Sequence, residues 1–378
     1  MLASRWAGFG TTVFTEASAL AERTGAVNLG QGFPDEDGPA EVVEAAVAAL
    51  RSGRNQYAPL PGVPALREAI AEHQRRFYGL EVDPEAGVQV TFGATEAVAA
   101  ALLGLCDPGD EVVALDPSYD SYGACAAMAG ATLRPVTLRP PGWEIDPEAL
   151  AAAIGPRTRL LLLNSPHNPT GKVLSRAELE LVADACRQHG LVAVCDEVYE
   201  HLVFDGEHVP LASLPGMAER TLTISSLGKT FSFTGWKVGW ACGPPELVAA
   251  VRAAKQFLSF AGGTPLQHAG AMALRLGDEV YAGLAATLRF KRDRLCAGLE
   301  AAGLTVHRPA GTYFANAGVD GDGAAFCRDL AARRGVVAIP TAVFYADPDD
   351  GRGLVRFAFC KREAVIDDAC ARLAPQPA

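Results

Sequence analysis

Lysine is scarce in this chain, which has six lysines against 27 arginines among its 378 residues. No run of 18 or more apolar residues occurs, so we expect no membrane-spanning helix. No basic block offsets the net charge of −11, which argues against nucleic acid as a partner. The first residues lack the long apolar stretch of an export signal, and we therefore expect the protein in the cytoplasm.

The sequence also lacks any C-x-x-C pair, although it contains nine cysteines. Several of them lie inside apolar runs, as Cys195 does at the end of the run that starts at Leu191. Cysteines in such runs are typically small core residues of a protein in a reducing compartment. We therefore expect neither a disulfide framework nor a metal site.

Internal repeats and low-complexity linkers are absent, and two different hydrophobic patterns follow one another along the chain. From about residue 41 to 260, helical patterns such as 41–50 and 63–76 alternate with short, continuous apolar runs. Continuous runs are typical of strands that are buried on both faces, with helices covering them. The pattern therefore predicts an α/β protein with a mainly parallel sheet flanked by helices. The expected strands are 88–91, 111–115, 160–163, 191–195 and 222–224.

Beyond about residue 275 the pattern changes to a long helical stretch, 278–302, followed by strands near Val306, at 312–315 and at 354–359. This predicts a second, smaller α+β domain. We expect three parts: a large domain at 36–277, a small domain at 278–378, and an N-terminal segment at 1–35. That segment joins the small domain or bridges to a partner subunit.

Because lysine is rare, the close pair Lys229 and Lys237 is informative. An amine can lose its proton and form a Schiff base, whereas a guanidinium cannot. The sequence Gly228-Lys229-Thr230 resembles the end of a phosphate-binding P-loop, but that motif needs a glycine at position 223, which is Thr. Lys229 could instead be a solvated surface lysine.

Other polar residues follow the expected strands, and ligands of open α/β sheets bind beyond the carboxyl ends of the strands. Gly93-Ala94-Thr95 can offer backbone N–H groups to a phosphate at a helix N-terminus, or can be a simple helix cap. Asp196 ends a buried strand, where a carboxylate costs several kcal/mol unless it is paired. The protonated ring nitrogen of pyridoxal phosphate (PLP) would pair with it. Asp196 could instead cap a following helix.

Four further residues have a function if the ligand is PLP. Asn168 and Tyr199 can donate to an oxygen on the ring; alternatively, Asn168 belongs to a turn and Tyr199 is a half-buried helix residue. Tyr119 can stack on the ring or lie in the core. Arg356 alternates with apolar residues on an expected strand, so it needs an anion, either a substrate carboxylate or an internal salt bridge.

Taken together and in this order, these stretches resemble the fold-type I, class I and II aminotransferases over essentially the whole chain. Within them the chain looks most like the branch of kynurenine, glutamine-phenylpyruvate, methionine and actinobacterial N-succinyldiaminopimelate aminotransferases. The stretches that carry the resemblance are 28–35, 55–59, 166–171, 196–201, the lysine segment 221–240, 311–314 and 355–361.

The resemblance implies that Lys229 holds PLP covalently and later moves a proton between the substrate Cα and C4′ of the cofactor. Tyr57 would reach the phosphate of a neighbouring subunit, which implies a homodimer, and His167 would be structural. The resemblance assigns ring contacts to Asp196, Tyr199, Asn168 and Tyr119, phosphate contacts to Ala94, Thr95, Ser226 and Lys237, and substrate contacts to Gly32, Asn168, Arg356 and Phe14.

The implied function is transfer of an amino group from an L-amino acid to a 2-oxo acid in a ping-pong cycle. The resemblance implies an aromatic, sulfur-containing or glutamine-like donor. Five aromatic residues hint at a pocket for large apolar or aromatic side chains: Phe14, Tyr119, Phe231, Phe233 and Phe260. No second arginine is identified for a distal carboxylate, although N-succinyldiaminopimelate stays open as a substrate.

The same residues are also compatible with a β-lyase that acts on cysteine S-conjugates, and with a specialised biosynthetic PLP enzyme. In both cases the cofactor contacts would be the same and only the substrate pocket would differ. A protein that binds PLP only as a sensor belongs to a different class. The intact set of lysine, aspartate and arginine argues against such a non-catalytic sensor.

Overall fold

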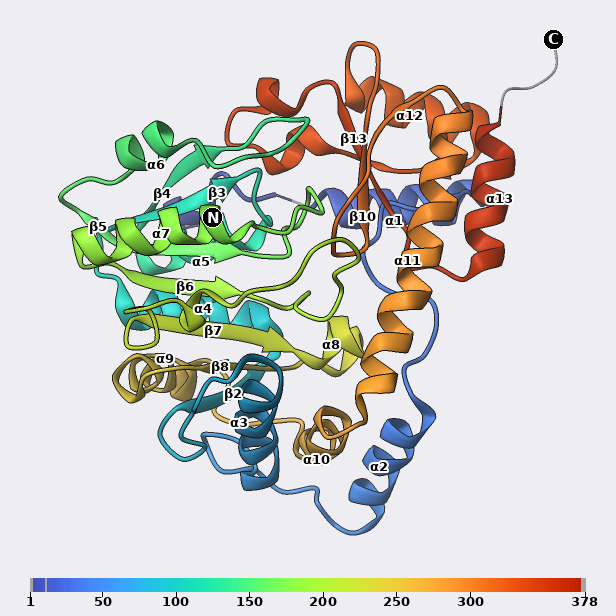
Figure 1. The fold of residues 1–378 in the computed structure, drawn as a ribbon. Coiled ribbons are helices and arrows are strands. Elements are labelled where there is room, and N and C mark those ends of the chain that lie inside the picture. The colour runs from blue at the N-terminus through green and yellow to red at the C-terminus, as the bar shows by residue number, and fades with distance from the viewer. Residues whose placement is uncertain (1–2, 11, 375–378) are drawn as a thin grey trace.

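The computed structural model describes residues 3–10 and 12–374, and a seven-stranded sheet forms its centre (Figure 1). Strand β8 runs antiparallel to both of its neighbours, and the other pairs in this sheet are parallel. The predicted mainly parallel sheet and its five expected strands are confirmed. In spatial order the strands are β2 (Val88–Phe92), β8 (Val238–Cys242), β7 (Thr221–Ser226), β6 (Val192–Asp196), β5 (Thr158–Asn164), β3 (Glu111–Asp116) and β4 (Thr132–Thr137).

Helices cover both faces of this sheet, because successive residues of its buried strands point to opposite sides. On β5, Leu160 and Leu162 pack against one helical layer and Leu161 and Leu163 against the other. The first layer contains α4 (Gly93–Leu105), α5 (Ser121–Ala129) and α9 (Pro245–Leu258), and the second contains α6 (Pro147–Ala153) and α7 (Arg176–His189). At the β2 and β8 end, α2 (Ala40–Arg51), α3 (Pro64–Tyr78) and α10 (Thr264–Leu274) form a further core.

The C-terminal part contains a four-stranded antiparallel sheet, as the change of pattern predicts. The strand expected at 312–315 starts later: β10 begins at Phe314, because Thr312 has a left-handed backbone with φ of 66°. In spatial order the strands are β12 (Ile339–Pro340), β13 (Leu354–Ala358), β10 (Phe314–Gly318) and β9 (Thr305–His307), and the helices are α11 (Asp278–Ala301), α12 (Gly323–Arg334) and α13 (Glu363–Leu373).

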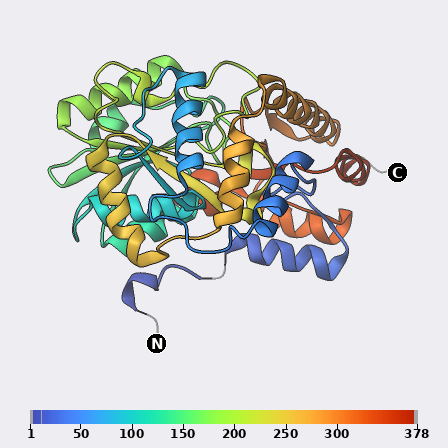
Figure 2. The same cartoon turned by 90° about the horizontal axis from the view of Figure 1, so that it is seen from below.

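The N-terminal segment lies against this C-terminal part. Strand β1 (Val27–Asn28) pairs in parallel with β11 (Val336–Val337), and α1 (Val13–Thr24) lies beside α12 in the view from below (Figure 2). The division of the chain at residues 35 and 277 stays a prediction. The remaining elements are α8 (Leu227–Thr230) and the 3₁₀ helices η1 (Ser4–Trp6), η2 (Leu211–Ser213), η3 (Thr234–Trp236), η4 (Thr341–Phe344) and η5 (Pro348–Gly351).

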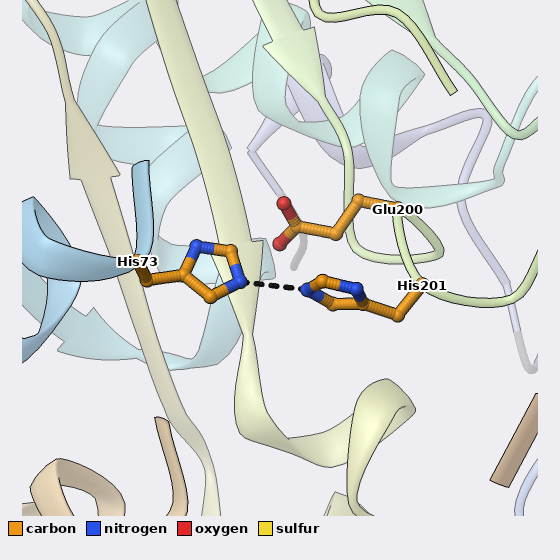
Figure 3. Close-up of side chains that lie close together, drawn as sticks. All are labelled: His73, Glu200 and His201. Carbon is orange, nitrogen blue, oxygen red and sulfur yellow. Dashed lines mark hydrogen bonds between the residues drawn. The ribbon is translucent and has the colours of Figure 1, made fainter. Parts of the chain in front are cut away.

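A pair of histidines, His73 buried and His201 partly buried, ties α3 to the segment that follows β6 (Figure 3). His73 Nε2 and His201 Nε2 are 2.6 Å apart, beside the carboxylate of Glu200. Two nitrogen ligands of one tetrahedral zinc ion would lie roughly 3.3 Å apart. Burial lowers the pKa of His73 to about 3, so the imidazole is neutral. The contact is therefore a hydrogen bond between two imidazoles.

Candidate active site

One cavity lies beyond the carboxyl ends of β5, β6 and β7, next to the N-terminus of α4. In an α/β sheet this is where a ligand is expected. The sequence-predicted residues that line this cavity are Ala94, Thr95, Tyr119, Asn168, Asp196, Tyr199, Ser226, Lys229 and Lys237.

Lys229 lies on the short helix α8, which starts directly after β7, so the strand end brings its amine to the cavity. Burial, helped by the positive charges of Lys237 and Arg356, lowers the pKa of this amine to about 8. Its Nζ donates a hydrogen bond to the hydroxyl of Tyr313 at 2.9 Å. The surface-lysine interpretation is therefore wrong, and the amine loses its proton far more easily than that of an exposed lysine.

Asp196 is a buried carboxylate at the end of β6. Its oxygens accept hydrogen bonds from the Tyr122 hydroxyl at 2.7 Å and from the Val198 amide at 3.3 Å. The interpretation of Asp196 as a helix cap is wrong, because a turn and not a helix follows at 197–201. Within the described residues no lysine or arginine forms an ion pair with it, and burial raises its pKa to about 6. A cationic ring nitrogen in the cavity would supply the missing charge.

The N-terminus of α4 and Lys237 together form an anion site. A Cβ atom added at Gly93, where φ is 72°, would lie 3.1 Å from Lys237 Nζ. The ammonium group is therefore close to the first turn of the helix, whose free N–H groups favour negative charge. Ala94, Thr95 and Ser226 line the same end of the cavity. This set of donors fits a phosphate group, and with Asp196 and Lys229 the cavity fits PLP.

Arg356 is fully buried on β13, and its guanidinium lies between the rings of Phe314 and Phe344, at 3.9 and 4.5 Å from their centres. Nη1 donates to Asn168 Oδ1 at 2.9 Å, and Nη2 donates to the Gly30 carbonyl at 3.3 Å. Nε has no partner within the described part of the chain. The interpretation of Arg356 as one partner of an internal salt bridge is wrong, because no carboxylate in the described part of the chain lies within ion-pair distance of it. Burial lowers the pKa of Arg356 to about 10, which leaves it charged.

The two other predicted substrate contacts lie next to Arg356. Phe14, on α1, has its ring centre 5.3 Å from the guanidinium. Gly32 is in a loop where a Cβ atom would lie 2.5 Å from Phe314 Cζ, so a larger residue would not fit without movement. The N-terminal segment therefore contacts Arg356 from the opposite end of the sequence, although Arg356, Phe14 and Gly32 do not themselves line the cavity.

Several predicted residues lie elsewhere. Tyr57 is 81% exposed and lies outside the cavity, with its ring 5.6 Å from that of Phe260. Phe231 and Phe233 belong to the core around β2 and β8, so their suggested place in the substrate pocket is wrong. His167 is buried and bonded to the Thr170 hydroxyl at 2.7 Å, which is consistent with its predicted structural role.

Two tyrosines that the sequence patterns do not single out complete the arrangement. Tyr122 holds Asp196, and Tyr313 holds Lys229. Tyr313 occurs in the stretch 311–314 that carries the family resemblance, and Tyr122 lies three residues after Tyr119. The sequence does not indicate the hydrogen-bond partner of either tyrosine, because Tyr122 is 74 positions from Asp196 and Tyr313 is 84 positions from Lys229.

A family model described as aminotransferase class I and II matches residues 24–373, and the chain belongs to this family. The protein is thus a PLP-dependent aminotransferase with the fold-type I architecture.

Its relatives include a probable N-succinyldiaminopimelate aminotransferase of Mycobacterium tuberculosis, 53% identical over 99% of this chain and 98% of that protein. The methionine aminotransferase of Escherichia coli is 42% identical over 96% and 95% of the two chains. The solved structure of N-succinyldiaminopimelate aminotransferase from M. tuberculosis superposes with a TM-score of 0.96, at 54% identity and 99% coverage of both chains.

Capture of PLP by the cofactor-free protein is expected to speed up with pH, with a midpoint near pH 8. Only the neutral amine of Lys229 attacks an aldehyde, and its pKa of about 8 replaces the ordinary 10.5. The rate is measured by following the absorbance of the bound cofactor after rapid mixing. A midpoint near 10.5 would show that the Lys229 amine is solvated, contrary to the structure.

Proposed function

We propose that this aminotransferase accepts amino donors with large apolar side chains, aromatic or sulfur-containing. The observation that carries this proposal is the aromatic wall beside Arg356, formed by Phe14, Phe314 and Phe344. In this arrangement the guanidinium binds the α-carboxylate through its unpartnered Nε and neighbouring N–H groups. The side chain of the donor then extends past Phe14, which is the one of these three rings that is partly exposed.

The roles of the residues follow from their contacts. When bound, PLP withdraws electrons from the substrate Cα and carries the amino group between the two acids. Asp196, held by Tyr122, would keep a positive charge on the ring nitrogen, and Lys237 with the first turn of α4 would bind the phosphate. Lys229, whose lowered pKa leaves part of the amine neutral, would take the proton from the substrate Cα and deliver it to C4′ of the cofactor. In this proposal Tyr199 and Asn168 contact the ring oxygen, and Tyr119 stacks on the ring.

A second candidate substrate is N-succinyldiaminopimelate, and the 53% identity with the M. tuberculosis protein favours it. The test is a panel of donors that includes methionine, phenylalanine, kynurenine, glutamine, glutamate and N-succinyldiaminopimelate. Each donor is supplied with 2-oxoglutarate or pyruvate, and the new amino acid is measured. Highest kcat/KM with methionine or an aromatic donor supports the first proposal, and highest kcat/KM with N-succinyldiaminopimelate supports the second. Release of pyruvate from a cysteine conjugate without any acceptor would instead indicate a β-lyase.

We also propose that the protein works as a homodimer in the cytoplasm. Large apolar side chains lie exposed near Tyr57, with Phe257 85% exposed and Leu258 and Phe260 also exposed at the end of α9. Exposed apolar residues grouped in this way are typical of a protein interface. Nine free cysteines support a reducing compartment. No helix in the described ranges is long and apolar enough to cross a membrane.

If Tyr57 completes the site of the partner subunit, two defective variants are expected to rescue each other. Each mixed dimer of Lys229→Ala and Tyr57→Ala protomers contains one site with both native residues, so random mixing restores about one quarter of the native sites. Activity is measured at limiting PLP after joint refolding, and subunit mass by sedimentation. A monomer by sedimentation, or a mixture no more active than its two components, would contradict the shared site.

A further inference from the structure

The hydroxyl of Tyr313 lies between the amine of Lys229 and the loop that contains Gly32. Lys229 Nζ donates to Tyr313 Oη at 2.9 Å, and Tyr313 Oη donates to the Gly32 carbonyl oxygen at 2.5 Å. The tyrosine is fully buried, and its ring packs edge-on against Tyr199 with centres 5.2 Å apart. The ring is therefore fixed from the side, and the hydroxyl has one position.

The direction of these two bonds follows from what each group can do. A carbonyl oxygen only accepts, so the single proton of the Tyr313 hydroxyl is committed to Gly32. The hydroxyl oxygen then faces Lys229 with lone pairs and accepts from the amine. Burial raises the pKa of Tyr313, so the phenol stays neutral and does not act as a base. One N–H bond of Lys229 is thereby held, which restricts the lone pair of the neutral amine to two directions.

The same loop also contacts Arg356, the residue proposed to bind the substrate carboxylate. The carbonyl of Gly30, two residues before Gly32, accepts from Arg356 Nη2 at 3.3 Å. The short segment 30–32 is thus bonded to Arg356 directly and to Lys229 through Tyr313. The position of the amine is in this way tied to the backbone beside the carboxylate-binding guanidinium.

We propose that Tyr313 is a positioning residue, which holds the free amine of Lys229 in the geometry for proton transfer at the substrate Cα. The inference rests on the proposed role of Lys229. It goes beyond that role because the hydroxyl group of Tyr313 determines how the Lys229 amine is oriented. Through Gly32, this orientation is linked to the loop beside Arg356.

The test is the Tyr313→Phe variant of the PLP-loaded enzyme, in which the ring keeps its place and the acceptor is lost. We expect kcat to fall by about 10- to 100-fold, the usual effect of a hydrogen bond to a charged group, with KM changed by less than about 3-fold. The isotope effect on kcat with Cα-deuterated donor should increase, because proton transfer becomes slower. In the cofactor-free variant the midpoint of PLP capture should move below about pH 8, since losing the acceptor removes a bond that favours the ammonium form of Lys229.

The matched control is Tyr281→Phe, which removes another buried hydroxyl bonded to a backbone carbonyl, that of Leu274 at 3.0 Å, outside the cavity. It reports the loss of stability alone, with kcat, isotope effect and capture midpoint unchanged. An active, folded Tyr313→Phe enzyme with native kcat, isotope effect and midpoint would overturn the proposal. So would losses that match those of Tyr281→Phe. Failure of the proposed function is distinguishable, because it would show as an inactive wild-type protein or as an active Lys229→Ala variant.

Discussion

Replacing Lys229 with Ala is expected to lower the rate of transamination by about 10⁴-fold or more, because in the proposed function this residue supplies both the covalent attachment and the base. The amine lies in the cavity with a pKa of about 8, and its neutral form is accessible at physiological pH. The visible absorbance of lysine-bound PLP should disappear with the activity. Both are measured on the same purified protein.

Two further variants separate amine chemistry from charge. Lys229→Arg keeps a cation but cannot bond covalently to the cofactor, so it should lose activity nearly as completely. Lys172→Ala removes a lysine that pairs with Glu178 at 3.0 Å and does not line the cavity, and it should remain active. Native turnover by the Lys229→Ala protein would exclude this residue from the reaction.

Replacing Arg356 with Leu is expected to reduce kcat/KM by roughly 30-fold to several thousand-fold, mainly through a higher KM. Losing one partner of a buried, hydrogen-bonded charge pair costs about 2–5 kcal/mol, and in the proposed function the substrate carboxylate is the partner that remains. Arg356→Lys retains the charge but not the two-pronged geometry, so its loss should be intermediate. Initial rates at varied donor concentration measure both parameters.

Arg352→Leu is the matched control, because this exposed arginine lies just before β13 and away from the cavity. Its kcat/KM should stay within about 2-fold of the native value, as for most surface substitutions. If Arg356→Leu keeps the native KM for every donor, the carboxylate is bound elsewhere. The guanidinium would then be only a filler between Phe314 and Phe344.

Much of the large sheet could be predicted, because its buried strands are uninterrupted apolar runs with helices between them. Strand β4 could not, since its sequence, Thr132–Thr137, contains a proline and an arginine and half of it is exposed. Strand β8 could not either, because Val238 and Trp240 lie within the lysine segment, whose glycines and polar residues hide the strand pattern. Such edge and antiparallel strands owe their conformation to their neighbours and not to their own pattern.

The site could be predicted where a residue type is costly without a partner. Asp196 and Arg356 are charged side chains in apolar strands, and the need for a counter-charge is visible in the sequence alone. Tyr313 and Tyr122 could not be found in this way, because a tyrosine is common in a hydrophobic core. The partner of its hydroxyl hydrogen bond comes from a segment that is distant in the sequence.

The pairing of β1 with β11 has a consequence for synthesis on the ribosome. Val27 is translated early, but its partner, Val336, emerges only after some 300 further residues. At about 5–20 residues per second this delay is roughly 15 to 60 s. During that time the apolar face of α1, with Ala17 and Ala21, has no partner strand to cover it. Until Val336 has emerged, this face of α1 cannot reach its native packing.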